Sequence, residues 1–274
     1  MKQKFFKKLV LALLLININS LANAQWTIKQ SLPSTPRNTA PSFVIGTTGY
    51  IVGGESSSGL LSDVWAYNPS GNSWNQVASF PGITRVKPVG FSINGIGYYG
   101  LGNDSTFFSY NPVTNTWSQL SSPPFVGLNY WSAMYFTVGN DAYFLLASSN
   151  IVLKYSTITN TWSQLSNFPG QTRFTGSGFA INAKGYVTCG VNSFGNPYLN
   201  DLWEYDPSTD NWSQKTSLPG TGRYGTLAVS LNGKGYLIGG ERYSPNTTIN
   251  EFWQYDPISD SWFQLQNFLG GPRA

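Results

Sequence analysis

The chain has 274 residues, of which 10% are charged and 16% aromatic, and it contains 29 Gly, 16 Pro, one Cys and no His. So little charge with so many aromatic residues excludes a disordered chain, and the Gly and Pro content favours many short strands joined by tight turns. A single Cys189 excludes an intramolecular disulfide, and the lack of His excludes a nucleophile–His pair and argues against a zinc or copper site. We therefore expect no metal and no cofactor.

The first residues predict a signal peptide. Four lysines come before the apolar run 9–16, and Ala22-Asn23-Ala24 has the small-x-small pattern of a cleavage site. We expect residues 1–24 to be removed and residues 25–274 to be secreted, to the periplasm or the extracellular space, as one domain. The apolar run is far shorter than the roughly 20 residues of a membrane span, and no later segment is long and apolar enough.

Removal of this leader changes the charge balance. The full chain has 16 Lys and Arg against 12 Asp and Glu, and four of the lysines lie in the leader, which leaves 12 against 12. A neutral mature chain gives no reason to expect nucleic acid or an anionic membrane surface as a partner.

The rest of the chain is an internal repeat. Trp stands at positions 26, 74, 117, 162, 212 and 262, and each Trp from 74 onward has Tyr seven places before it, Asn or Asp two before it and Gln two after it. Arg stands twelve places before a Gly-Tyr pair in four units, and a small-residue pair such as Gly53-Gly54 follows the Tyr by three places. The chain thus contains five units with fixed internal spacing.

Each unit predicts four strands. Short apolar segments without helical period, such as 90–93 and 227–230, are expected as inner strands. Turns such as Asn94-Gly95 link them to a second strand, which in the first unit is 49–54. A third strand carries 65–67 in that unit, and Asn-Pro or Asp-Pro turns the chain into an outer strand that starts at the repeat Trp. One such sheet cannot bury both faces, so the units must stack around an axis.

These motifs resemble the kelch repeat. The glycine pair, the run Asp201 to Pro207 and the downstream Trp carry the resemblance, which covers nearly all of the mature chain. It implies an all-β, kelch-type β-propeller with five complete four-stranded blades. The third unit departs most, with Tyr130 in place of Arg, Leu146-Ala147 in place of the glycines and Leu153 in place of the third-strand Trp.

The two ends of the repeat array do not match a whole number of units. Residues 26–32 are predicted to be an unpaired outer strand with no blade before it, and residues 268–273 copy the pattern of residues 168–173, which leads into a blade. We expect either five blades with loose ends or a six-bladed ring of which the last three strands are missing from this sequence.

The repeated arginines have two interpretations. Arg37, Arg85, Arg173 and Arg223 recur where the chain enters the inner strand. One interpretation is structural, with each guanidinium bound to backbone carbonyls that link blades or stacked on an aromatic ring. The other is a basic collar at one mouth of the axial channel that grips the carboxylate of an acidic ligand, in which case charge reversal would leave the melting temperature unchanged.

Loops of variable length between second and third strands indicate a ligand face at the same end of the propeller. They span residues 55–61, 191–199 and 241–249, and their candidate ligand-binding side chains are Glu55, Phe194, Tyr198, Glu241 and Tyr243. The acids Asp63, Asp201 and Glu251 instead share one repeat position before the third-strand Trp, which predicts a structural role in hydrogen bonding.

The function expected from these features is binding. Kelch propellers include both enzymes and interaction modules, so the resemblance alone does not select between them. Galactose oxidase, a kelch-type enzyme, holds copper with histidines and tyrosines, and this chain has no His. We expect an exported module that binds a protein or glycan partner, with no catalytic residue assigned. The alternative is a sugar mutarotase or epimerase similar to N-acetylneuraminate epimerase, which acts on an acidic sugar.

Overall fold

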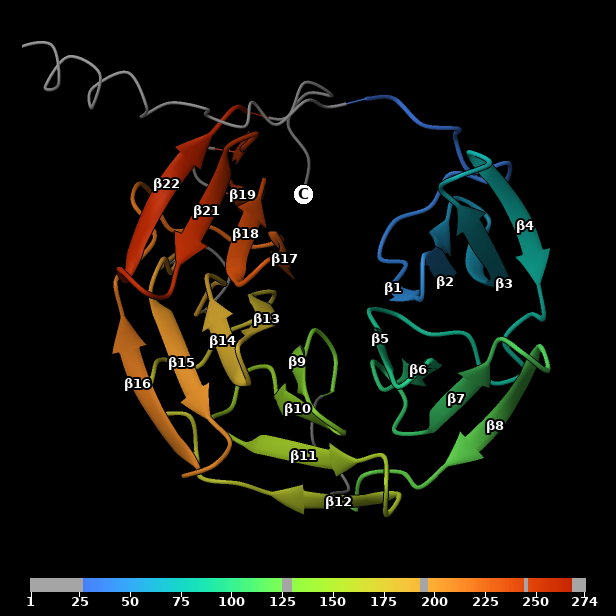
Figure 1. The fold of residues 1–274 in the computed structure, drawn as a ribbon, viewed down its shortest axis with the longest axis horizontal. Helices are drawn as coiled ribbons and strands as arrows, with labels where there is room; N and C mark the ends of the chain where they lie inside the picture. Colours follow the sequence, from blue (N-terminus) through green and yellow to red (C-terminus); the bar gives the residue numbers. More distant parts are fainter. Residues whose placement is uncertain (1–26, 125–129, 193–196, 244–245, 268–274) are drawn as a thin grey trace, which may run out of the picture.

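The computed structural model describes residues 27–124, 130–192, 197–243 and 246–267. These residues form 22 strands and no helix, and hence no helix that could cross a membrane. Five antiparallel sheets of four strands stand as blades around one axis, with the first strand of each sheet nearest the centre (Figure 1). The prediction of an all-β propeller with five four-stranded blades is confirmed.

The blades follow one another along the chain. The first consists of β1 (Ser42–Ile45), β2 (Thr48–Ser56), β3 (Gly59–Asn68) and β4 (Ser73–Val77). The second consists of β5 (Val89–Ile93), β6 (Ile96–Gly100), β7 (Phe107–Asn111) and β8 (Thr116–Leu120). The third consists of β9 (Met134–Val138), β10 (Asp141–Leu145), β11 (Val152–Ser156) and β12 (Thr161–Gln164).

The last two blades have the same strand order. The fourth consists of β13 (Ser177–Ile181), β14 (Lys184–Thr188), β15 (Leu202–Asp206) and β16 (Asn211–Lys215). The fifth consists of β17 (Leu227–Leu231), β18 (Lys234–Ile238), β21 (Phe252–Asp256) and β22 (Ser261–Leu265). A small hairpin of β19 (Glu241–Tyr243) and β20 (Asn246–Thr248) is inserted between its second and third strands.

Successive blades interlock through an aromatic ring and a glycine. In the first four blades, a Phe of the inner strand stacks on a Tyr of the second strand, with ring centroids 5.1–5.4 Å apart. Three of these Phe residues also pack on the glycine of the Gly-Tyr pair in the next blade, whereas the third blade has Ala142 at that position. A Cβ placed on Gly97 would lie 2.5 Å from the ring of Phe43, and one on Gly235 would lie 2.5 Å from the ring of Phe179. The glycine is therefore required because the neighbouring ring fills the space of a side chain.

At the periphery, a Tyr, an Asn or Asp and a Trp form a clip to the preceding blade. In the third blade the hydroxyl of Tyr155 and the backbone N–H of Ser121 both donate to Asn160 Oδ1, at 2.9 and 3.0 Å. The indole N–H of Trp162 donates to the carbonyl of Ser121 at 2.8 Å. Asn160 has a left-handed backbone with φ of 53°, a conformation that Asn and Asp tolerate. These contacts explain the fixed Tyr, Asn or Asp and Trp spacing of the repeat.

The clip recurs in the other blades with one departure. The backbone N–H of the residue four places after the preceding Trp donates to the Asn or Asp at Asn115, Asp210 and Asp260. The indoles of Trp117 and Trp262 donate to the same residue's carbonyl. The buried indole N–H of Trp212 has no acceptor among the described residues. Of the five repeat tryptophans only Trp262 is buried, at 9% exposed, and the other four are half-buried, so they seal the outer seams between blades rather than the centre of the core.

The segment before the first blade uses the same clip. The backbone N–H of Gln30 donates to Asn72 Oδ1, and its carbonyl accepts from the indole of Trp74, both at 2.9 Å. Residues 27–32 are not in a strand, so the outer strand predicted there is not formed, and Trp26 lies outside the described residues. The segment nevertheless contacts the first blade as the end of a preceding outer strand would.

The fifth and first blades are not joined like the others. β1 packs on β5, β5 on β9, β9 on β13 and β13 on β17, whereas the described residues show no comparable packing of β17 on β1. Figure 1 shows these two blades on either side of the one interval in the circle of blades.

We predict that Trp162→Ala destabilises the protein by about 3–5 kcal/mol, because it opens a cavity against Phe107 and Phe144 and removes the bond to Ser121. Tyr198→Ala, in a half-buried loop position, should cost much less. Chemical denaturation of both variants measures the difference. Equal losses of unfolding free energy would contradict the assignment of Trp162 to the seam between blades.

Candidate functional site

The repeated arginines lie inside the blades as part of an ion-pair network. Arg173 is 0% exposed, and its two terminal nitrogens donate to the two carboxylate oxygens of Asp201, each at 2.7 Å. It also donates to the carbonyl of Cys189 at 3.1 Å and lies over the ring of Phe168 at 4.9 Å. The indole of Trp203 donates to Asp201 from the other side at 2.7 Å. The network therefore ties the loop before the inner strand to the second and third strands.

The same network recurs in the other arginine-containing blades. Arg37 pairs with Asp63 at 2.6 Å and Arg223 with Glu251 at 2.6 Å, and Trp65 and Trp253 donate to these acids. Arg85 pairs with Asp104 at 3.0 Å, a residue outside the repeat position. The carbonyl that each arginine reaches is always sixteen residues on, at Gly53, Leu101, Cys189 and Gly239.

The basic collar is therefore a wrong interpretation of these residues. Arg85, Arg173 and Arg223 are at most 1% exposed, and the side chain of Arg37 is 5% exposed. Their guanidinium groups already bind carboxylates and carbonyls, so they are not available at a channel mouth. The structural interpretation of the arginines and of Asp63, Asp201 and Glu251 is the one that these contacts support.

The third blade lacks the whole network. Tyr130 replaces the arginine, Ile151 the acid and Leu153 the tryptophan, and Tyr130 is buried. We expect the arginine and its acid to be replaced together, because a buried charge without its partner costs several kcal/mol of stability.

The arginine end of the axis contains a cavity of about 480 Å³. Its lining includes one residue from each blade two places after the arginine position, and all five have left-handed backbones with φ between 46° and 66°. These five residues are Thr39, Lys87, Ser132, Thr175 and Gly225. The buried hydroxyls of Ser132 and Thr175 have no hydrogen-bond partner in the described part of the chain. We call this cavity the axial mouth.

Lys87 and Glu241 give the axial mouth its charge. The ammonium of Lys87 lies 4.1 Å from the ring centroid of Trp131, a cation–π contact, and forms no ion pair with any residue that the structure describes. Burial lowers the pKa of Lys87, and the charge of Glu241 opposes that shift. Glu241 and Tyr224 also line the cavity. The axial mouth can thus offer one cation, one carboxylate and several hydroxyls to a ligand.

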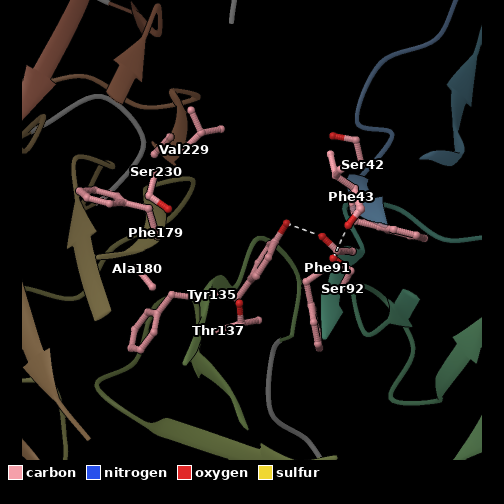
Figure 2. A pocket seen from close by; sticks show the side chains of 15 residues that line it. Ser42, Phe43, Phe91, Ser92, Tyr135, Thr137, Phe179, Ala180, Val229 and Ser230 are labelled. Atoms are coloured by element: carbon pink, nitrogen blue, oxygen red, sulfur yellow. Dashed lines mark hydrogen bonds between the residues drawn. The ribbon is translucent and has the colours of Figure 1, made fainter. Parts of the chain in front are cut away.

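Below the axial mouth, Tyr135 projects into the central channel. Its hydroxyl donates to the carbonyl of Gly90 at 2.6 Å, and burial raises its pKa to about 12. The channel is a cavity of about 460 Å³ lined by all five inner strands (Figure 2). Because Tyr135 lines both cavities, it divides the axial mouth from the channel.

The structure disperses the loop residues predicted as ligand contacts. Glu241 lines the axial mouth, whereas Glu55 is exposed and lines another cavity beside Arg37. Tyr198 stacks with Tyr224 at a centroid distance of 6.2 Å, so it lies behind a residue of the axial mouth. Tyr243 lies in β19, and Phe194 lies outside the described residues.

Sequence analysis missed Lys87, Trp131 and Tyr224. The signal for Lys87 was present, because it stands two places after a repeat arginine where the other units have Thr39, Ser132, Thr175 and Gly225. Lys87 is the one charged residue at this position of the five units, and the blade structure does not require a charge there. In the described residues no group of three or more Cys, Asp or Glu could hold a metal ion.

Comparison with known proteins identifies the repeat. Residues 36–81 and 222–269 match the Kelch motif. The solved structure of YjhT superposes with a TM-score of 0.72 at 19% sequence identity, covering 88% of this chain and 87% of that one. No curated protein matches in sequence. The chain is a β-propeller of five four-stranded blades that carries Kelch motifs. Because 782 chains of solved structures match this fold, the fold alone selects no function.

We predict that Arg173→Tyr destabilises the protein by about 3–5 kcal/mol, because Asp201 is then left partly buried without its cation. The triple variant Arg173→Tyr, Asp201→Ile, Trp203→Leu reproduces the residues of the third blade and should be more stable than Arg173→Tyr alone. Urea denaturation compares them. If the triple variant were less stable than Arg173→Tyr, the remaining contacts of Asp201 and Trp203 would stabilise the fold by more than the unpaired charge of Asp201 destabilises it.

Acid should weaken the protein through the same pairs. The Arg37 guanidinium, with help from Trp65 and Ser34, lowers the pKa of Asp63 to about 2 from an ordinary value of 3.8. A carboxyl with a depressed folded pKa stabilises the fold above its unfolded pKa and loses that contribution as pH falls. We therefore expect stability to fall between about pH 4 and pH 2.

Thermal unfolding from pH 7 to pH 2.5 measures this loss, and Asp63→Asn, which cannot titrate, should show a shallower fall over that window. An identical pH profile for Asp63→Asn and the parent chain would exclude a contribution from this pair.

Proposed function

We propose that the protein is an exported propeller that binds an acidic glycan in the axial mouth. The observation that carries the proposal is Lys87, a cation on a tryptophan ring that no described carboxylate pairs, in a cavity with unused hydroxyls. A carboxylate on a sugar would give Lys87 the ion pair that the protein does not supply. The predicted leader supports export.

The size and lining of the axial mouth favour a saccharide over a protein surface. A cavity of about 480 Å³ lies in the range of small-molecule sites, whereas a protein partner would need a larger face. Ser132, Thr175 and Tyr224 can exchange hydrogen bonds with sugar hydroxyls.

A second function, sugar mutarotation or epimerisation, is favoured by one observation. Lys87 and Glu241 line the same cavity, and burial lowers the pKa of the Lys87 ammonium. The Glu241 carboxylate could act as general base, and the Lys87 ammonium with its lowered pKa could act as general acid, in opening the ring of a sugar at its anomeric carbon. Binding and catalysis would then use the same residues.

We predict that N-acetylneuraminic acid binds more tightly than neutral N-acetylglucosamine, and that Lys87→Met weakens its binding by about tenfold through loss of one charge-assisted bond. Isothermal titration measures both, and Lys29→Met, an exposed lysine away from the cavity, is the matched control. Equal affinity for the two sugars, or no effect of Lys87→Met, would contradict the proposal.

Proton NMR of anomer exchange distinguishes binding from catalysis, since an acceleration of the exchange that Glu241→Gln removes would establish catalysis.

A further inference from the structure

One inner-strand position that faces the axis carries a large side chain in the third blade alone. In every blade it precedes the inner-strand residue that is paired with the Tyr of the second strand. Four of the five blades have a small residue there. The five residues all line the central channel, and they are Ser42, Gly90, Tyr135, Gly178 and Ala228. Tyr135 is thus a departure from the repeat at the axis, as Lys87 is in the axial mouth.

The packing of blades favours a small residue at this position. A Cβ on Gly178 would lie 2.2 Å from the backbone oxygen of Tyr135, and one on Gly90 would lie 2.9 Å from the Cβ of Pro41. Glycine is needed at these two places because the inner strands of adjacent blades approach each other closely. The contacts between blades therefore do not account for the ring of Tyr135.

The Tyr135 side chain is held in place at its ring and at its hydroxyl. The ring centroid lies 5.9 Å from that of Phe91 and 6.5 Å from that of Phe144. The hydroxyl donates to the carbonyl of Gly90 in the second blade at 2.6 Å (Figure 2). Because burial raises the pKa of Tyr135 to about 12, this hydroxyl keeps its proton at neutral pH and remains a donor. Tyr135 is therefore a fixed partition beside the axis.

This partition separates two cavities of similar size. The axial mouth has a volume of about 480 Å³ and the channel about 460 Å³, and among the described residues Tyr135 is the only one that lines both. Each volume lies within the roughly 300–1,000 Å³ of single small-molecule sites. Ser42, Thr137 and Ser230 line the channel with hydroxyls. A saccharide chain that passed Tyr135 would therefore find hydrogen-bonding groups on the other side.

The partition restricts which unit of a saccharide chain the axial mouth can hold. An internal unit is joined to the chain on both sides, so one of its neighbours would have to continue past Tyr135 into the channel or turn back through the entrance. An end unit has one neighbour, which can extend from the entrance into solvent. Removal of the Tyr135 ring would join the two cavities and give the chain a second way out.

We propose that Tyr135 is a specificity-determining residue of the axial mouth, which restricts its ligand to a free acidic sugar or the end unit of an acidic glycan. The ring acts by filling the space through which a further unit would enter the channel. The proposal rests on the acidic-glycan binding proposed above, and it adds which part of the glycan is bound.

The test compares N-acetylneuraminic acid with its linear homotetramer by isothermal titration. In the parent chain the two affinities should agree within about threefold, because each molecule offers only an end unit to the axial mouth. In Tyr135→Ala, which has the small residue of the fifth blade, the tetramer should bind at least about tenfold more tightly than the monomer. The reason is that further units would enter the channel and form hydrogen bonds there.

Two further variants control for the substitution itself. Tyr135→Phe retains the ring, so it should keep the two affinities within about threefold of each other. Tyr135→Ser, which has the residue of the first blade, repeats the test with a second small side chain. The measured quantity is a ratio of affinities for one folded protein, so a general loss of stability would not change it. Melting temperatures verify that each variant is folded.

The parent chain alone gives a second measurement. A long polymer of the same sugar should bind at most two protein molecules whatever its length, because it has two ends. A number of bound proteins that grows with polymer length would overturn the proposal, since internal units would then be bound.

The titrations separate failure of this proposal from failure of the proposed function. An unchanged affinity ratio in folded Tyr135→Ala and Tyr135→Ser, while the monomer still binds, would overturn the role of Tyr135 and leave the acidic ligand in place. A parent chain that binds neither monomer nor tetramer would overturn the acidic ligand itself, and the role of Tyr135 with it.

Discussion

The structure depends on the contact between one four-stranded sheet and the next. Each sheet has two apolar faces, so it is buried only when it has a neighbour on both sides. Near the axis the contact is a Phe ring seated on a glycine, as for Phe43 and Gly97. At the rim it is a pair of hydrogen bonds to one backbone position, as for Ser121 with Asn160 and Trp162. The repeat pattern is the set of residues that make this contact.

That dependence explains which features sequence could predict. Gly-Tyr, the glycine pair and the Asn or Asp before each Trp recur because they make the contacts between blades. Their spacing was therefore enough to predict the strands and the propeller. The partner of each arginine was harder to find, although Asp63, Asp201 and Glu251 also recur. Arginine and acid lie 26 or 28 residues apart, and only the folded blade brings them together. Position alone therefore left both interpretations of the arginines open.

The axial mouth could not be predicted in the same way, because its residues come from five units and few of them repeat. Lys87 stands where the backbone is left-handed in all five blades, and its ammonium lies over the ring of Trp131. Glu241 stands at the start of a hairpin between the second and third strands whose only counterpart in the described residues is the extension of β2 and β3 in the first blade. A residue that serves one blade can only be recognised as unusual once the blades are superimposed by their repeat.

The third blade shows that the arginine–acid network and the peripheral clip are under different physical constraints. Its Tyr130, Ile151 and Leu153 replace a complete charged network, yet the blade keeps the clip through Tyr155, Asn160 and Trp162. The buried network can be removed as a set because its charges cancel one another, whereas loss of the clip would remove the two hydrogen bonds that tie Ser121 to the next blade. The identity of the residues that join blades is thus constrained by hydrogen-bond geometry. Positions without such a contact, such as Lys87, can instead vary to suit a ligand.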